Sequence, residues 1–278
     1  MVQFSAFADE VSSDFKEQVD FLVAQNVRYM EIRFVNGKNI IYLDKNELKE
    51  VKRLLDQNGI SISAIGSPIG KVRIDDDFAV HFDKFRYSIE IAQFLEAPFI
   101  RVFSYYPPEG KNIDLYRDEV IRRMQKKVDL LRDSNIILVH ENESHIFGHS
   151  AEKCVELVSA VNSPKLKLAY DPANFVWGDN ITNNIEQCWP LMKPYVIHVH
   201  IKDWKLGSKD IGCMPGSGDG QIKELLSELK VMNYSGFITM EAHLKTGGQF
   251  GGDTGPELFK EALTITQKLC DETGLEYN

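Results

Sequence analysis

The stretch Ile136–Glu143, with the sequence IILVHENE, joins an apolar run directly to two glutamates. A short apolar run bounded by polar residues is typical of a strand buried in a sheet. Carboxylates at the end of a buried strand add little to stability, because a charged group loses its hydration on burial. Glu141 and Glu143 therefore indicate a site that holds a cation or moves protons.

Three later stretches of the chain end in the same way. LKLAYD ends at Asp171, VIHVHIKD ends at Asp203, and GFITME ends at Glu241. Each is a short apolar run that runs into an acidic residue. We interpret the four ends as parts of one site and the rest of the chain as the frame that assembles it.

The fold follows from an alternation of short apolar runs and longer amphipathic runs. Strands are expected at 3–7, 29–34, 60–66, 99–104, 136–141, 165–171, 195–201 and 237–241, and helices at 14–25, 45–58, 75–95, 114–133, 150–161, 184–192, 220–232 and 256–270. Strands that alternate with helices of this length pair in parallel through crossovers. Eight such units in 278 residues predict an α/β fold, a (β/α)8 TIM barrel.

An open doubly wound sheet is the alternative fold, but no G-x-G-x-x-G follows an early strand. No break in composition marks a linker, so we expect one domain over residues 1–278.

Composition excludes several classes of protein. Hydrophobic residues make up 43% of the chain and charged residues 26%, which is ordinary for a soluble globular protein. The net charge of −9 argues against binding to nucleic acid or to anionic membranes. The four cysteines form no C-x-x-C pair, and the N-terminus lacks the pattern of a signal peptide, so we expect free thiols and a cytoplasmic protein.

In a barrel, the C-terminal ends of the strands converge on one face, where active sites form. The polar residues expected there are Glu31, Arg33, Arg101, Ser104, His140, Glu141, Glu143, Asp171, Asn174, His198, His200, Lys202, Asp203, Glu241 and His243. Carboxylates crowded into a cleft repel one another unless a cation or a proton lies between them. We expect three carboxylates and one imidazole to bind one divalent ion, of which Mn²⁺, Mg²⁺, Co²⁺ and Zn²⁺ all suit such ligands.

Two choices within this ligand set stay open. His198 and His200 point to the same side of their strand, and His200, nearer the C-terminal end, is the better ligand. His198 is then a substrate group or a hydrogen-bonded core histidine. Glu141 ends its apolar run and is the preferred ligand on that strand, whereas Glu143, two residues further out, is the alternative ligand or a substrate contact.

Other polar and aromatic stretches have two readings each. Arg33, Arg101, Lys202 and Lys245 either balance an anionic substrate or pair with nearby carboxylates. The loop Tyr105–Pro108 either walls a sugar pocket or packs internally. The glycine-rich stretch Gly247–Gly255 either binds an anion through its backbone N–H groups or closes over the site as a lid.

The chain resembles the xylose isomerase-like TIM barrel superfamily, in particular its sugar phosphate isomerase and epimerase group. The matching pieces are FADEVSSDF, YMEIRF, IILVHENE, LAYDPANF, VIHVHIKDW, PGSGDGQI and GFITMEAH. The resemblance implies that Glu141, Asp171, His200 and Glu241 hold one divalent ion. It also implies that Glu141 and Glu241 exchange a proton on opposite faces of the substrate carbon.

Two positions depart from the epimerases of that family. Asn174 stands where several of them have histidine, and Lys202 and Lys205 lie near the place of a familiar substrate arginine. The three zinc sites of the family's DNA-repair endonucleases need further histidines, which the second and third expected strands lack.

The resulting hypothesis is a divalent-metal-dependent isomerase or epimerase of a small sugar or sugar phosphate. Glu141 and Glu241 are its expected catalytic pair, and the expected substrate-binding residues are Glu31, Arg33, Glu143, Asn174, His198 and Lys202. A dehydratase of a keto-polyol, such as a keto-inositol or dehydroshikimate, is the alternative. A sugar-binding protein without turnover is a further one. The hypothesis also allows a homo-oligomer.

Overall fold

Eight parallel strands close into a barrel in the computed structural model, which describes residues 1–209, 211–248 and 251–278. Around the barrel the order is β1-β10-β9-β8-β7-β6-β5-β2. The strands are β1 Gln3–Ala6, β2 Tyr29–Ile32, β5 Ser61–Ile65, β6 Phe99–Val102, β7 Ile137–Glu141, β8 Leu166–Tyr170, β9 Val196–Ile201 and β10 Phe237–Met240. The predicted TIM barrel is confirmed.

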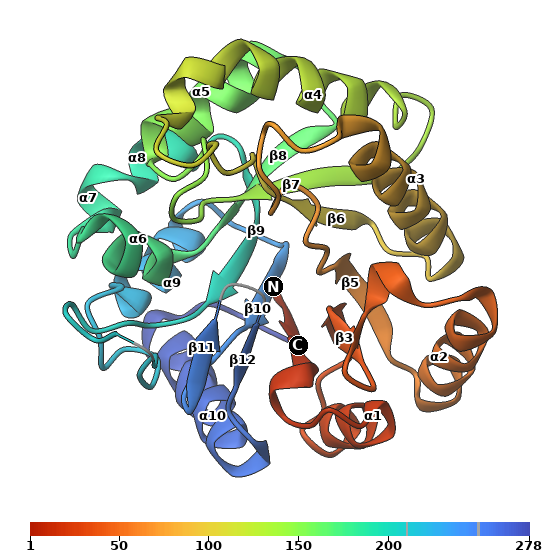
Figure 1. The fold of residues 1–278 in the computed structure, drawn as a ribbon. Coiled ribbons are helices and arrows are strands. Elements are labelled where there is room, and N and C mark those ends of the chain that lie inside the picture. The colour runs from red at the N-terminus through yellow and green to blue at the C-terminus, as the bar shows by residue number, and fades with distance from the viewer. Residues whose placement is uncertain (210, 249–250) are drawn as a thin grey trace.

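Helices surround the ring of strands, as Figure 1 shows looking along the barrel. They are α1 Phe15–Ala24, α2 Lys45–Asn58, α3 Phe78–Phe94, α4 Arg117–Asp129, α5 Ala151–Val161, α6 Pro172–Asp179, α7 Asn184–Gln187, α8 Trp189–Met192, α9 Ile222–Val231 and α10 Pro256–Thr273. Among the described residues, three short 3-10 helices occur in the connections: Ala8–Glu10, Ile40–Tyr42 and Ile113–Tyr116.

The helix boundaries have local chemical causes. Asp44 caps α2 by accepting hydrogen bonds from the backbone of Asn46 and Glu47, and the Glu47 side chain bonds back to the Asp44 N–H. Gly59 ends the same helix in the left-handed conformation, with φ of 64°. Asp14 and Asp77 cap α1 and α3 through their carboxylates. These caps hold the helices at the positions expected from the sequence.

Two of the predicted helices differ in form from the prediction. The single helix expected over 184–192 is divided into α7 and α8, because Pro190 supplies no backbone N–H and is accommodated only in the first turn of a helix. The helix expected over 114–133 begins as a 3-10 turn and becomes α-helical only at Arg117.

Two short antiparallel pairs were not predicted: β3 Phe34–Val35 with β4 Lys38–Asn39, and β11 Thr246–Gly248 with β12 Gly251–Asp253. The β11–β12 pair overlaps the glycine-rich stretch Gly247–Gly255, for which anion binding and a lid were the two interpretations. Gln249 and Phe250, at its centre, lie outside the described residues.

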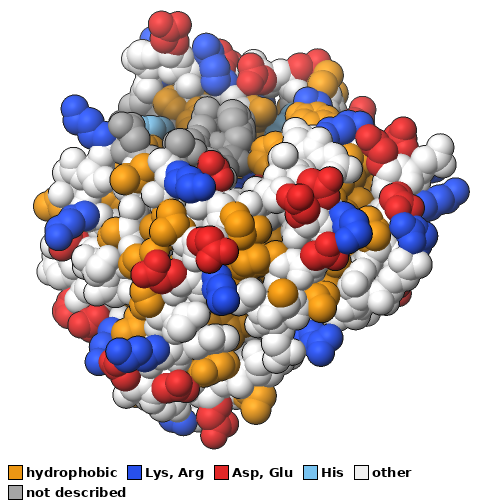
Figure 2. Space-filling view, turned by 90° about the horizontal axis from the view of Figure 1, so that it is seen from below, with side chains coloured by type: hydrophobic (Ala, Val, Ile, Leu, Met, Phe, Trp, Pro, Cys, Tyr) orange, Lys and Arg blue, Asp and Glu red, His pale blue; other side chains and the backbone are white. Residues whose placement is uncertain are grey.

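The chain termini meet where β1 begins, and the Val2 N–H donates to the Glu276 carbonyl at 2.7 Å. In the part of the chain that the structure describes, no helix is long and apolar enough to cross a membrane. All four cysteines are free thiols, as expected. Figure 2 shows the face seen from below the view of Figure 1, where acidic and basic side chains are interspersed.

Candidate metal centre

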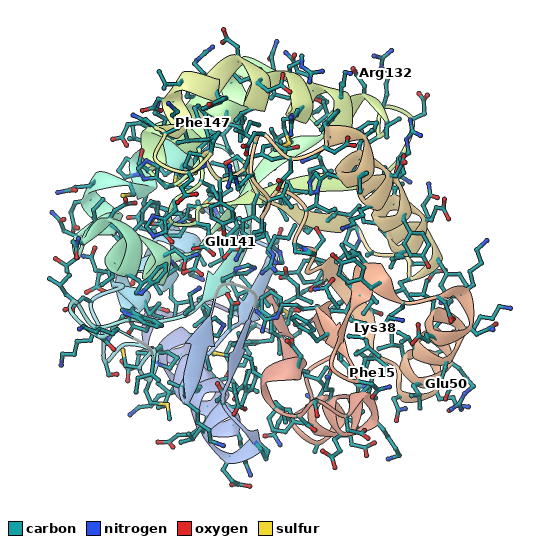
Figure 3. The ribbon with its side chains drawn as sticks, in the orientation of Figure 1. Phe15, Lys38, Glu50, Arg132, Glu141 and Phe147 are labelled. Carbon is teal, nitrogen blue, oxygen red and sulfur yellow. The ribbon has the colours of Figure 1, made fainter. Side chains whose placement is uncertain are left out.

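Four side chains from four neighbouring strands meet at the C-terminal end of the barrel. Glu141 is the last residue of β7, Asp171 follows β8, His200 lies in β9, and Glu241 follows β10. One potential ligand atom of each lies within 4.8 Å of those of the other three, and all four side chains are buried. Figure 3 labels Glu141 near the middle of the ring of elements, far from the peripheral Glu50 and Arg132.

Asp171 is fixed by its place at the start of α6. Its Oδ1 atom accepts a hydrogen bond from the Asn174 N–H at 3.1 Å, so the residue is the N-cap of that helix. Asn142 clamps the Asp171 backbone with two hydrogen bonds of 2.9 Å. Together these bonds leave Oδ2 as the atom of Asp171 that faces the cluster.

α6 itself was not predicted, although the sequence carried its signal. Asp171 followed by Pro172 is an N-cap followed by a proline in the first turn, which is a common helix start. The new helix places Asn174 beside Glu141, with 3.2 Å between Asn174 Nδ2 and Glu141 Oε1.

Carboxylates hold the His200 ring from both sides. Nδ1 lies 3.1 Å from Glu141 Oε1, and Nε2 lies 3.1 Å from Glu31 Oε2. The same Glu31 oxygen lies 2.6 Å from His198 Nε2. A metal-binding imidazole commonly donates its other N–H to a carboxylate in this way. Glu31, expected to contact substrate, contacts the two histidines and is fully buried.

The two glutamates of the opening stretch have different surroundings. Glu141 belongs to the four-residue cluster, whereas Glu143 belongs to none of the metal-compatible groups among the described residues. Glu143 Oε2 pairs with Lys71 Nζ at 2.8 Å, and Glu143 Oε1 accepts from the Ser144 N–H at 2.9 Å. The geometry therefore favours Glu141 over Glu143 as the ligand.

Three basic side chains lie against the carboxylates. Arg33 Nη1 lies 2.7 Å from Glu241 Oε1, Arg101 Nη1 lies 3.3 Å from Glu141 Oε2, and Lys202 Nζ lies 2.6 Å from Asp171 Oδ2. All three are buried. The sequence left two interpretations for these residues, balancing an anionic substrate or pairing with nearby carboxylates. In the structure all three pair with carboxylates.

Crowding shifts the pKa values of the cluster. Burial raises the pKa of Asp171 to about 7; the Lys202 charge opposes this rise, and the charges of Glu141 and Glu241 add to it. Burial lowers the pKa of His200, but Glu141 and Glu31 outweigh it and raise the pKa to about 10. Without a metal ion, the raised pKa values of Asp171 and His200 thus favour a bound proton on these two groups.

The residues fit a divalent ion. Asp171 Oδ2 is buried and accepts no well-aligned hydrogen bond among the described residues, and its charged neighbour is the Lys202 ammonium at 2.6 Å. The donor set of three carboxylates and one imidazole suits ions that prefer oxygen with some nitrogen. Buried Glu, Asp and His side chains here are therefore consistent with a divalent metal site.

Asp9, Glu10 and His243 lie beside the centre, and the sequence analysis gave none of them a role. Asp9 Oδ2 pairs with Arg33 Nε at 2.8 Å, while His243 Nε2 lies 3.2 Å from both Glu10 Oε1 and Glu241 Oε1. Asp9 and Glu10 lie in the 3-10 helix Ala8–Glu10 that comes after β1, so a search for acidic residues just beyond each strand end would have found them. The groups Glu10–Glu241–His243 and Glu31–His198–His200 share Glu241 and His200 with the four-residue cluster.

Tyr105, in the loop expected either to wall a sugar pocket or to pack internally, and His81 both lie in packed surroundings. Tyr105 is fully buried, so it does not wall a pocket. His81 lies in α3, where its Nε2 atom accepts from the Gly70 N–H at 3.1 Å.

Solved structures of similar fold cover almost the whole chain. A D-tagatose 3-epimerase-like protein superposes with a TM-score of 0.79 at 18% identity, covering 98% of each chain. A xylose isomerase-like TIM barrel protein from Mycobacterium smegmatis, in complex with magnesium, gives 0.75 at 14% identity, covering 99% of this chain and 97% of that one. The probable 3-DHS dehydratase AsbF from Bacillus anthracis gives 0.74 at 15% identity, covering 96% and 99%.

At these identities the likeness concerns the fold. A search of curated protein sequences found no match. A family model described as "Xylose isomerase-like TIM barrel" matches residues 19–269, which is most of the chain. The chain therefore belongs to the xylose isomerase-like TIM barrel family.

Proposed function

We propose that the protein is a divalent-metal-dependent isomerase or epimerase of a small sugar or sugar phosphate. The observation that carries the proposal is the convergence of Glu141, Asp171, His200 and Glu241, with ligand atoms within 4.8 Å of one another. Membership of a family whose solved relatives include a sugar epimerase-like protein supports the same class of enzyme.

Glu141, Asp171, His200 and Glu241 would hold the ion, which when bound would polarise a substrate carbonyl and so acidify the neighbouring C–H bond. Glu141 and Glu241 are the proposed proton carriers, one removing the carbon-bound proton and the other returning one. Nearby positive charge lowers the pKa of both carboxyl groups despite their burial, chiefly through His200 for Glu141 and Lys202 for Glu241. Both side chains are therefore held in the carboxylate form, which metal binding and proton acceptance both require.

The remaining site residues position these groups and the substrate. Glu31 and His198 orient His200, and Asn174 orients Glu141 through its 3.2 Å contact. Arg33 and Lys202 balance the carboxylate charge, and Glu143 with Lys71 forms a polar contact near the same end of the barrel. The metal identity, with Mn²⁺ as the first candidate, remains part of the proposal.

Solvent exchange tests the proposed reaction. Wild-type protein loaded with Mn²⁺ is incubated in D₂O with a panel of ketoses and ketose phosphates, and carbon-bound deuterium is measured by NMR. We expect deuterium at the carbon next to the carbonyl of at least one sugar, and its loss in Glu241→Gln. No exchange in any substrate would reject isomerase and epimerase chemistry.

A dehydratase is the second candidate, because the probable 3-DHS dehydratase from Bacillus anthracis superposes over 96% of this chain with a TM-score of 0.74. The same pair of carboxylates would remove a proton and assist loss of a hydroxyl as water. Formation of an enone from a keto-polyol, detected by its ultraviolet absorbance, would favour dehydration over isomerisation.

A further inference from the structure

Lys202 contacts two carboxylate oxygens of the four-residue cluster that could otherwise bind a metal ion. It follows β9 directly and has the same parity along the chain as His198 and His200, so its side chain points toward the same side. Lys202 Nζ lies 2.6 Å from Asp171 Oδ2 and 3.5 Å from Glu241 Oε2. The side chain is buried, so bulk water does not screen these contacts.

The other oxygens of the same two carboxylates are already engaged. Asp171 Oδ1 accepts from the Asn174 N–H at 3.1 Å, and Glu241 Oε1 accepts from Arg33 Nη1 at 2.7 Å. Asp171 Oδ2 and Glu241 Oε2 are thus the atoms open to a metal ion, and both face Lys202. A divalent ion binds carboxylate oxygen at about 2.0–2.2 Å, which would bring it close to an ammonium on the same atoms.

We propose that the Lys202 ammonium and a divalent ion are alternative cations for Asp171 Oδ2 and Glu241 Oε2, so that ion binding displaces Lys202. Two cations on the same pair of buried oxygens repel each other strongly. Without the ion, Lys202 offsets the repulsion between the carboxylates and keeps the cluster assembled.

The displacement also gives Lys202 a second role, which rests on the proposed function. Once displaced, the ammonium is free to donate a hydrogen bond to a substrate oxygen at the same end of the barrel. Metal loading would then be the step that makes Lys202 available to substrate.

Calorimetric titration with Mn²⁺ tests the competition in wild type, Lys202→Met and Lys71→Met. Methionine keeps the length of the side chain without its charge. Lys71 is the matched control, because its partner Glu143 lies outside the four-residue cluster. We expect Lys202→Met to bind Mn²⁺ at least about tenfold more tightly than wild type, and Lys71→Met to bind as wild type does. Equal affinity in Lys202→Met and wild type would overturn the proposal.

A crystal structure of the wild type with Mn²⁺ separates displacement from simple repulsion and does not depend on the folding of a variant. The proposal requires Lys202 Nζ to move more than about 4 Å from Asp171 Oδ2, beyond ion-pair distance. An unmoved ammonium would overturn it. Mn²⁺ binding without deuterium exchange into sugars would reject only the proposed function, whereas no Mn²⁺ binding in either wild type or Lys202→Met would reject both.

Discussion

At the scale of single residues, the site depends on which oxygen and nitrogen atoms remain open after the local hydrogen bonds are made. Glu141 keeps its carboxylate in the cluster, beside His200 and Asn174. Glu143, two residues later, is held by Lys71 and by the Ser144 backbone. Two glutamates of the same parity thus have different chemistry, which burial and partners decide.

Substituting these two glutamates separates their roles. We expect Glu141→Gln to weaken Mn²⁺ binding by more than about 100-fold, since even outer-shell changes at metal sites cost about 10–100-fold. Glu143→Gln should leave the Mn²⁺ affinity within a few-fold of wild type. Calorimetric titration measures both, and a larger loss in Glu143→Gln would exchange the two assignments.

Glu31 offers a test of ligand orientation. Its Oε2 atom lies 3.1 Å from His200 Nε2 and 2.6 Å from His198 Nε2. Glu31→Gln keeps the shape of the side chain but presents an uncharged amide to both rings. We expect Mn²⁺ affinity to fall by about 10–100-fold while the fold is retained, as monitored by circular dichroism. Unchanged affinity would show that Glu31 does not orient the ligand histidine.

At the scale of elements, the connections after the strands determine what reaches the site. The loop after β5 carries Lys71 and turns at Gly70, whose φ is +98°. A Cβ atom at Gly70 would lie 2.0 Å from the Phe103 carbonyl oxygen, which is backbone and cannot move aside. Glycine is therefore required here by space as well as by conformation.

Gly70→Ala should destabilise the protein by about 2 kcal/mol or more, through backbone strain and the collision together. Gly110→Ala is the matched control, because Gly110 also has a positive φ, of 67°, but nothing lies within 4 Å of its added Cβ. Urea unfolding measures both variants. Equal losses in the two would mean that the contact with Phe103 does not matter.

His81 in α3 makes stability depend on pH. Burial, together with the charge of Lys127, lowers the pKa of His81 to about 3, whereas an unfolded histidine titrates near pH 6.5. Between these values the unfolded chain binds a proton that the folded protein does not. The contribution of His81 is therefore complete above about pH 6.5 and is lost as the pH falls toward 3.

His81→Gln should reduce this pH dependence, because glutamine can still accept from the Gly70 N–H without taking up a proton. We expect the slope of unfolding free energy against pH between 4 and 6 to fall by up to about 1.4 kcal/mol per pH unit. Urea unfolding at several pH values gives the slope. An identical slope in the variant would assign the acid sensitivity to other groups.

At the scale of the whole molecule, barrel closure explains how residues as distant in sequence as Arg33 and Glu241 come into contact. The alternation of apolar and amphipathic runs predicted the strands and most helices, because each strand is buried and each helix has one buried face. The same pattern predicted the four cluster residues, since the C-terminal ends of parallel strands share one edge. The extent of one domain over 1–278 stays a prediction, as does a homo-oligomer.

The features that the sequence did not predict depend on local hydrogen bonds or on contacts between distant segments. α6 was missed because its start, Asp171–Pro172, was interpreted only as a strand end. The helices α7 and α8, and the strand pairs β3–β4 and β11–β12, are too short to give a periodic signal. The position of Lys202 against Asp171 and Glu241 depends on three strands at once, and no spacing within one strand predicts it.

We propose that one divalent ion is bound by Glu141, Asp171, His200 and Glu241. Anomalous scattering from crystals grown with Mn²⁺ tests it most directly. We predict a single strong anomalous peak within bonding distance of one atom from each of these four residues. A peak at Glu31–His198–His200 or at Glu10–Glu241–His243 instead, or no peak at this end of the barrel, would contradict the claim.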